Sequence, residues 1–345
     1  MTNGESGVPL STKPSDGGDK PVRVAVVGTG HFGRYHVKHY AQNKNAELVA
    51  VVDADPATAD AVAREYGCAA LYDHRDLRGR VDAASVVVPT SQHFAIAGEL
   101  HEAGIDTLVE KPLSDTIASA ESLMERAESR KLILQVGHIE RFSSCFRALT
   151  GMVRAPMYFE SNRISPWQER NLDADVIFDL MIHDIDIILG LADSNVIDVS
   201  AVGTRLFSDK VDLANARLIF ESGCVANITA SRVSHKVERS LRVFQPGSYL
   251  VCDFVTHRIF TYTAKGDPRK GSVGAVASNV VDVPREDSLA NEIDEFLSCV
   301  RNRTRPTVDG RAGVEAVRIA EQVNDSIQRH LENVRRHAAS DSPRV

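Results

Sequence analysis

The chain has 345 residues with 40 Lys and Arg against 47 Asp and Glu, so its formal net charge is −7. It therefore lacks the basic surface field that draws proteins to nucleic acid or anionic lipid, and we expect neither as a partner. No apolar run approaches the roughly 18 residues that a membrane-spanning helix needs. At about 150 residues per domain, this length favours two domains.

The ends of the chain and its cysteines indicate where the protein works. Residues 1–21 are rich in Gly, Ser, Pro and Asp without the apolar core of a signal peptide, so we expect a disordered tail and a cytoplasmic protein. A second tail is expected over 336–345. The five cysteines stand singly, which favours reduced thiols over disulfides or zinc ligands, and we expect no metal.

Residues 22–142 alternate short apolar strands with amphipathic helices, the pattern of a parallel sheet with helical crossovers. This pattern predicts a Rossmann-type, doubly wound domain. The expected strands are 22–27, 48–52, 84–88, 106–109 and 132–136; the expected helices are 32–42, 56–67, one ending at Gly104, and 115–130.

Residues 143–308 read as a second, α+β domain, because strands follow one another there with glycine turns and little helix. The expected strands lie within 156–163, 196–206, 213–223, 224–233, 241–247, 249–255 and 257–262, and the expected helices are 176–191 and 286–302. The alternation over 214–221 predicts a mostly antiparallel sheet with helices on one face and room for another subunit on the other. A last helix, within 309–335, is expected to pack back toward the first domain.

A phosphate-binding loop is indicated directly after the first strand. Gly28, Gly30 and Gly33 form the pattern G-x-G-x-x-G at the start of a helix, where the backbone N–H groups of His31 and Phe32 would face a pyrophosphate. Asp53 ends the second strand, where a carboxylate binds ribose hydroxyls and repels a 2′-phosphate. The pattern favours NAD over NADP.

Polar residues follow the expected strands 84–88 and 106–109, at the edge where open α/β sheets bind ligands. Lys111 can exchange a proton with a substrate hydroxyl there, although an exposed loop lysine is the equally good alternative. The Lys111–Pro112 bond is a candidate for the cis form. The residues expected at the cofactor on this edge are Pro89, Thr90, His93, Glu110 and Lys111.

A helix expected over 176–191 is apolar but carries Asp179, His183 and Asp186 at helical spacing on one face. Asp179 could orient the ring while His183 takes a hydroxyl proton near neutral pH. An internal ion pair that ties the helix to the sheet is the alternative interpretation.

Together these motifs resemble the Gfo/Idh/MocA oxidoreductases over residues 22–333. The resemblance rests on the glycine loop, Val88-Pro89-Thr90 with His93, Glu110-Lys111-Pro112 and the Asp-x-x-x-His helix. It implies an NAD-dependent enzyme in which Lys111 lies beside nicotinamide and substrate and His183 is the catalytic histidine. It also implies an open, mostly antiparallel second sheet that pairs between subunits, as a homodimer or homotetramer.

The second domain resembles in particular the UDP-N-acetylglucosamine 3-dehydrogenase branch of that family, through 137–142, 163–166, 179–186, 215–217 and 226–234. Residues 143–144, Ser-Ser where Asn-Pro would be expected, depart from the pattern. The resemblance implies oxidation of the sugar 3-hydroxyl in preparation for a 3-amino sugar of lipid A. The candidates for the substrate diphosphate and base are Arg141, Arg163, Arg170, Arg232 and Trp167, each of which packing or surface charge explains equally well.

Two other functions remain open at this point. A relative acting on a free sugar or inositol would have the same cofactor site but no diphosphate contact through arginine. A sensor that binds the dinucleotide without turnover would need neither Lys111 nor His183.

Overall fold

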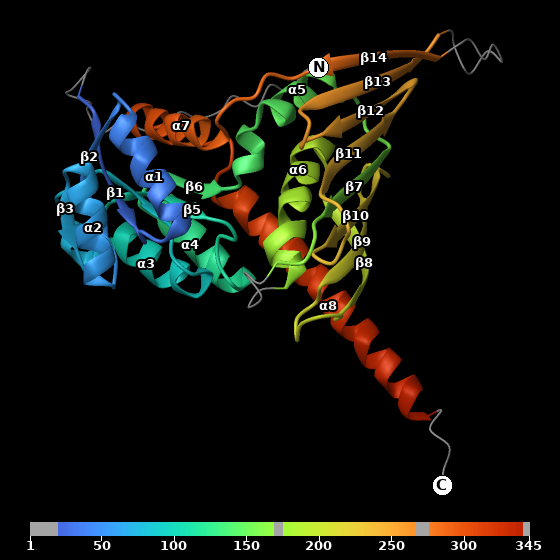
Figure 1. Ribbon diagram of the computed structural model, residues 1–345, viewed down its shortest axis with the longest axis horizontal. Helices are drawn as coiled ribbons and strands as arrows, with labels where there is room; N and C mark the ends of the chain where they lie inside the picture. The colour runs from blue at the N-terminus through green and yellow to red at the C-terminus, as the bar shows by residue number, and fades with distance from the viewer. Residues whose placement is uncertain (1–19, 169–174, 266–275, 341–345) are drawn as a thin grey trace. The chain divides into compact units, whose positions relative to one another are not determined.

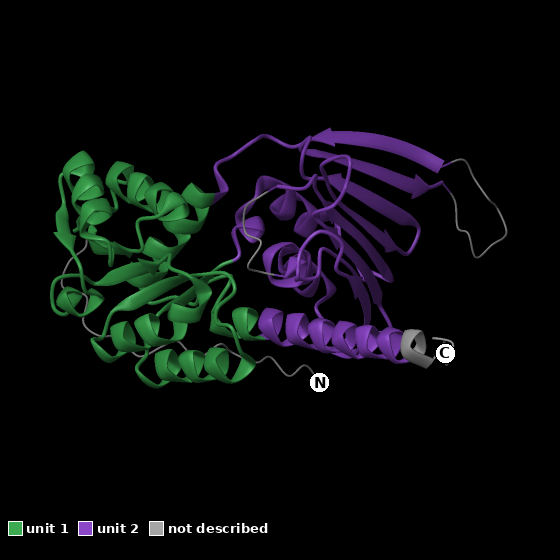
Figure 2. Ribbon diagram, turned by 60° about the horizontal axis from the view of Figure 1, so that its bottom comes forward, with its two compact units in different colours: residues 1–137, 289–314 green, residues 138–288, 315–345 purple. Residues whose placement is uncertain are grey.

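The computed structural model describes residues 20–168, 175–265 and 276–340. These residues form two compact units (Figure 2). Unit 1 holds the described residues up to Gly137 together with Leu289–Val314, and unit 2 holds His138–Ser288 and the chain from Glu315 onward. Among the described residues, no helix combines the length and apolar character that crossing a bilayer requires.

Unit 1 is built on a parallel six-stranded sheet in the order β3-β2-β1-β4-β5-β6 (Figure 1). The strands are β1 (Val22–Val27), β2 (Ala46–Val52), β3 (Ala69–Leu71), β4 (Ala83–Val86), β5 (Asp106–Glu110) and β6 (Leu134–Gly137). The apolar strand β1 lies between β2 and β4, where the strand order reverses. Sheets of this kind bind ligands at that point, outside the carboxyl ends of the strands. The predicted doubly wound domain is confirmed.

Five helices complete unit 1, and α3 and α4 lie side by side on its sheet (Figure 1). They are α1 (His31–Gln42), α2 (Pro56–Tyr66), α3 (Thr90–Glu102), α4 (Ile117–Ser129) and α7 (Ser288–Asn302), with a short 3₁₀ turn η1 (His74–Leu77). Local sequence sets the ends of α2: the Asp55 carboxylate accepts the N–H groups of Ala57 and Thr58, and Gly67 follows the helix with φ 71°.

Unit 2 is an eight-stranded sheet in the order β14-β13-β12-β11-β7-β10-β9-β8. The strands are β7 (Tyr158–Ile164), β8 (Val196–Thr204), β9 (Leu213–Phe220), β10 (Val225–Ser231), β11 (Glu238–Gln245), β12 (Ser248–Asp253), β13 (Arg258–Ala264) and β14 (Val276–Asp282). All neighbours are antiparallel except β7 and β10. The predicted mostly antiparallel sheet is confirmed.

Helices cover one face of this sheet (Figure 1). They are η2 (Ile139–Phe142), α5 (Ser144–Met152), the π turn η3 (Ile177–Met181), α6 (Ile182–Ala192) and α8 (Gly310–Ser340). The core of unit 2 lies between the sheet and these helices, with Phe159 of β7, Ile185 of α6 and Val323 of α8 among its buried side chains. Burial in this layer is the main source of the unit's stability.

The two closing helices are divided between the units. Helix α7 belongs to unit 1, whereas the sequence placed it in the second domain, and α8 belongs to unit 1 up to Val314 and to unit 2 beyond it. The reason is the apolar stripe of α8, whose Ile319 and Val323 lie in the core of unit 2. Only its first turn packs in unit 1, where a Cβ on Gly313 would lie 2.6 Å from Val136 Cγ2.

The other face of the unit 2 sheet carries a row of aromatic rings across four strands. Tyr158 of β7 packs edge-on against Phe244 of β11, with ring centroids 5.7 Å apart. Phe244 stacks on Tyr249 of β12 at 5.5 Å, and Tyr249 on Tyr262 of β13 at 4.4 Å. A continuous apolar row on a face opposite the helices is typical of an interaction surface.

Candidate functional site

The glycine loop between β1 and α1 has the conformation that its sequence predicts. Gly28 has φ 90°, and a Cβ there would lie 2.2 Å from the carbonyl oxygen of Val87. A Cβ on Gly33 would lie 1.9 Å from the carbonyl oxygen of Gly28, whereas one on Gly30 would meet nothing within 4 Å. Gly28 and Gly33 are thus required by the fold, and Gly30 leaves open space over the loop for a phosphate group.

The start of α1 is suited to an anion. No side chain caps this helix end, and its first turn contains no acidic residue. The side chains of His31 and Phe32 are exposed, and their backbone N–H groups belong to the first helical turn, which has no intrahelical acceptors. These groups fit a dinucleotide pyrophosphate.

Asp53 lies at the end of β2 beside the same loop. Its Oδ2 accepts hydrogen bonds from the N–H and the hydroxyl of Thr29, both at 2.8 Å, and its Oδ1 accepts the N–H of Asp55 at 3.0 Å. The carboxylate is therefore fixed in place before any ligand arrives. This is the position from which an acid reaches the adenosine ribose.

After the carboxyl end of β4, His93 differs from Pro89 and Thr90 in being buried. Pro89 precedes α3 as its N-cap and Thr90 begins the helix, and neither is buried. The His93 ring is only 1% exposed, with Nδ1 2.9 Å from the Pro112 carbonyl and Nε2 2.9 Å from the Val88 carbonyl. Burial lowers the pKa of His93. We had expected His93 at the cofactor, but its ring instead ties together the loops that carry Pro89 and Lys111.

Glu110 ends β5 and Lys111 follows it, and the bond from Lys111 to Pro112 is cis, as expected. Lys111 is partly exposed at the strand's carboxyl edge. The Glu110 carboxylate points inward instead: it accepts the Lys111 backbone N–H at 3.2 Å and lies 3.3 Å from His36 Nε2. Glu110 therefore belongs to the interior of unit 1, in contrast to the expected cofactor contact.

The helix that carries His183 starts irregularly. Residues 177–181, with Asp179, form a π turn before α6 begins, a feature that the apolar pattern did not indicate and that often occurs at functional sites. Asp179 and His183 are partly exposed, whereas Asp184 and Asp186 are 2% and 1% exposed. His183 is thus the accessible titratable group among residues 182–188.

Arg163 is locked inside unit 2, contrary to the expectation that it meets a substrate diphosphate. Its Nε lies 2.7 Å from Asp184 Oδ2 and its Nη1 2.9 Å from Glu140 Oε1, and the side chain is 4% exposed. These ion pairs raise the pKa of the guanidinium against the effect of burial. Its hydrogen-bonding capacity is used to join β7 to α6 and η2.

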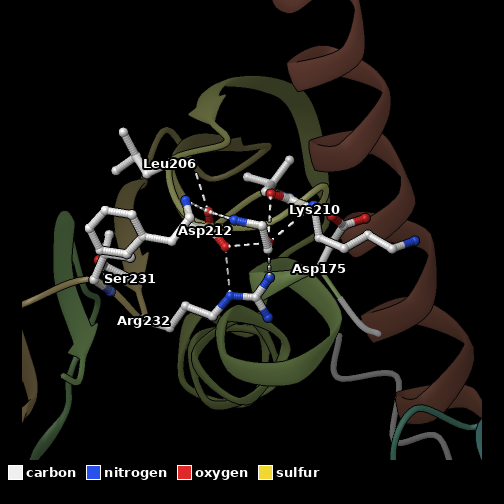
Figure 3. A network of polar contacts seen from close by, with 10 residues as sticks. Asp175, Leu206, Lys210, Asp212, Ser231 and Arg232 are labelled. Carbon is white, nitrogen blue, oxygen red and sulfur yellow. Dashed lines mark hydrogen bonds and ion pairs between the residues drawn. The ribbon is translucent and has the colours of Figure 1, made fainter. Parts of the chain in front are cut away.

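Arg232 is engaged in a similar way (Figure 3). Its Nε lies 2.9 Å from Asp212 Oδ1, and Asp212 also accepts the N–H groups of residues 206–208 and the Ser208 hydroxyl. Burial alone would raise the pKa of Asp212, but these hydrogen bonds hold it well below its usual range. Trp167 packs edge-on against Phe207 and under the Arg232 guanidinium, so Arg232 has a structural role here.

Arg141 is also largely enclosed, with Nη1 3.1 Å from the Asp186 carbonyl oxygen and 3.7 Å from its Oδ1. The guanidinium lies over the Phe146 ring at 4.8 Å, and a Cβ on Gly190 would collide with it at 1.8 Å. Gly190 therefore leaves the room that the Arg141 guanidinium occupies, and it is the feature of the sequence that could have indicated this packing. Arg170, another diphosphate candidate, lies outside the described residues.

Comparison with known proteins agrees with this geometry. The family model described as "Oxidoreductase family, NAD-binding Rossmann fold" matches residues 22–138, and the model of the Gfo/Idh/MocA C-terminal domain matches residues 147–246. The chain belongs to the Gfo/Idh/MocA oxidoreductase family. Its first domain is the NAD-binding Rossmann domain of that family, as the glycine loop and the uncapped start of α1 indicate.

Within the Gfo/Idh/MocA family, the relatives are dehydrogenases that act on CH–OH groups. The UDP-N-acetylglucosamine 3-dehydrogenase of Acidithiobacillus ferrooxidans is 36% identical over 90% of this chain and 99% of its own. Its solved structure superposes with a TM-score of 0.83 over 89% of this chain and 98% of that one. The scyllo-inositol 2-dehydrogenase (NAD(+)) of Bacillus subtilis is 28% identical over 83% of this chain and 88% of its own.

Proposed function

We propose that the protein oxidises the 3-hydroxyl of UDP-N-acetylglucosamine to the 3-keto sugar with NAD. The observation that carries this proposal is the likeness to the Acidithiobacillus ferrooxidans enzyme, which extends through both domains at 36% identity and covers 99% of that protein. Substrate choice in such a two-domain enzyme depends on the second domain, which is included in the match. The proposal does not rest on Arg163 or Arg232, because their guanidinium groups are paired within the protein.

The reaction needs a group that removes the hydroxyl proton while the hydride leaves the sugar carbon. NAD, when bound, supplies the hydride acceptor. We assign the hydroxyl proton to Lys111 and His183, whose side chains are partly exposed and can exchange protons. We assign to Asp179, which lies in the π turn before His183, the role of orienting the imidazole ring.

The product of this oxidation is a ketone at a carbon that carried a hydroxyl group. A 3-keto sugar is a substrate for a PLP-dependent aminotransferase, which would convert it to a 3-amino sugar of the kind found in lipid A. We place the reaction in the cytoplasm, in agreement with the sequence composition.

The test compares UDP-N-acetylglucosamine with N-acetylglucosamine and myo-inositol as substrates for NAD reduction. We expect a kcat/KM for the nucleotide sugar at least about a hundredfold higher, as contacts worth about 1.5–3 kcal/mol each would give. Equal use of myo-inositol would favour the polyol dehydrogenase, and tight NAD binding without any turnover would favour a sensor. Lys111→Met and His183→Ala should each lower kcat by about 10²–10⁴-fold with NAD affinity retained.

We also propose that the protein is a homo-oligomer whose subunits pair through the open face of the unit 2 sheet. The aromatic row from Tyr158 to Tyr262 supports this proposal, because a second copy of the same face would remove the row from water. Tyr249→Glu should reduce the mass measured by light scattering to that of one chain. Arg239→Glu, an exposed position on β11, is the control, and an unchanged mass for Tyr249→Glu would contradict the proposal.

A further inference from the structure

A cluster of titratable side chains in the interior of unit 1 has no part in the reaction proposed above. It joins His36 of α1, Glu110 at the end of β5 and Glu292 of α7. One side-chain nitrogen or oxygen from each lies within 4.8 Å of the other two, and His36 Nε2 lies 3.3 Å from Glu110 Oε1. His36 and Glu292 are fully buried.

On one side, a chain of hydrogen bonds leads to His36. The Tyr40 hydroxyl lies 2.8 Å from Ser85 Oγ, which in turn lies 3.2 Å from His36 Nδ1. The ring's other nitrogen, Nε2, lies 3.3 Å from Glu110 Oε1 without forming a hydrogen bond, and neither of these two atoms has a hydrogen-bond partner among the described residues. The other oxygen of Glu110 accepts the backbone N–H of Lys111 at 3.2 Å. Glu110 thus connects the interior to the backbone of Lys111.

Glu292 is the third residue of the cluster. Neither of its carboxyl oxygens has a hydrogen-bond partner among the described residues, while its backbone carbonyl accepts the Gln135 amide at 3.0 Å. An ionised carboxylate enclosed in this way would pay a large desolvation penalty. Burial, followed by the charges of Glu110 and of Glu295 on the same helix, raises the pKa of Glu292 well above its ordinary value. Enclosure without a hydrogen-bond partner therefore favours the neutral, protonated form of the Glu292 carboxyl group.

We propose that Glu292 is a positioning residue. As a neutral carboxylic acid it keeps its proton and donates a hydrogen bond to Glu110, and this bond steadies the carboxylate that accepts the Lys111 backbone N–H. The proposal deepens the role assigned to Lys111 and rests on it. The separation of up to 4.8 Å can be closed by side-chain rotation or by one water molecule. The Glu110 carboxylate packs directly on Gly137 of β6, since a Cβ there would lie 2.6 Å from Glu110 Oε1.

The protonation state can be tested without any substrate. Glu292→Gln mimics the neutral acid, and Asp294→Asn, an exposed acid on the same helix, is the matched control. The infrared difference spectrum between the wild type and Glu292→Gln at pH 7 should contain a protonated carboxyl band, which Asp294→Asn lacks. Absence of the band would overturn the proposal. So would one equivalent of a divalent metal in the purified wild-type protein that is lost in Glu292→Gln, because the metal would then neutralise the cluster.

The pH dependence of stability gives a second readout that packing alone would not change. A raised pKa in the folded state means that stability is lost as pH rises above about 4.3, the ordinary pKa of Glu. Glu292→Gln lacks this loss, so its Tm should exceed that of the wild type by a margin that grows between pH 5 and 8. His36, Glu110, Glu295 and Tyr40 are the other titratable groups facing the cluster, and all are common to both proteins. A margin independent of pH would contradict the proposal.

Two measurements test the positioning role: hydrogen exchange of the Lys111 backbone N–H, and steady-state kinetics. Glu292→Ala should speed hydrogen exchange of the Lys111 N–H and lower kcat by up to about 10²-fold with NAD affinity unchanged. Glu292→Gln and Asp294→Asn should change neither. Unchanged exchange in a folded Glu292→Ala protein would overturn the positioning role. If the wild type oxidises no nucleotide sugar, the proposed function fails, but the exchange and infrared results still decide this proposal.

Discussion

Replacing Arg163 by Met tests whether this arginine stabilises the fold or binds substrate. The substitution keeps an unbranched apolar stem but removes the guanidinium that is the partner of Asp184, which is 3% exposed at its side chain, and of Glu140. Breaking a buried ion pair from one side costs about 3–5 kcal/mol, because the remaining charge has no compensation. At about 2–4 °C per kcal/mol for a unit of this size, Tm should fall by about 6–20 °C.

The assay is thermal unfolding followed by circular dichroism, with Arg311→Met as the control. Arg311 pairs with Glu128 in unit 1, away from the aromatic row, and both side chains are at least half exposed, so its loss should cost no more than about 1 kcal/mol. Adding Asp184→Asn to Arg163→Met should recover part of the lost stability, since the buried charge then disappears. An unchanged Tm together with a raised KM for the nucleotide sugar would refute this reasoning and return Arg163 to the substrate site.

Three further predictions concern the loop, the cofactor and acid stability. Gly28→Ala should abolish detectable NAD binding in calorimetry, because its Cβ would overlap the Val87 carbonyl oxygen at 2.2 Å; binding within tenfold of wild type would contradict the loop geometry. Asp53→Ser should weaken NAD and improve NADP use, measured as the ratio of kcat/KM values, and a wild type that already uses both equally would remove Asp53 from cofactor selection. The pKa of Asp212 is lowered in the folded state, so its contribution to stability is present above about pH 4 and lost below it. The Tm difference between wild type and Asp212→Asn should therefore shrink as pH falls from 5 to 2, and a constant difference would contradict the Asp212 assignment.

Much of the fold follows from local sequence, because strand periodicity, glycine turns and helix caps act over a few residues. Most of the first domain is predicted in this way, down to the Gly67 that ends α2, but the three-residue strand β3 is not. Two elements of unit 2 were missed. Helix α5 is short, and β14 is a mostly exposed edge strand, so neither carries a strong apolar pattern.

The partners of the arginines could not be predicted, because they lie far away along the chain. Arg163 pairs with Asp184, 21 residues later in the chain, and Arg232 pairs with Asp212, 20 residues earlier. No local sequence pattern links either pair. The same holds for Glu292, which reaches the cluster from a helix near the end of the chain. Sequence identified the glycine loop because that loop is contiguous; a buried charge network depends on which elements pack together.

The central claim is that hydride leaves the C3 carbon of a nucleotide sugar. UDP-N-acetylglucosamine carrying deuterium at C3 tests it directly, with NAD as the oxidant and mass spectrometry of the NADH and the sugar product. We predict that deuterium appears in the NADH and disappears from a 3-keto product. Deuterium retained in the oxidised sugar, or NAD reduced by free myo-inositol but not by the labelled nucleotide sugar, would contradict the claim.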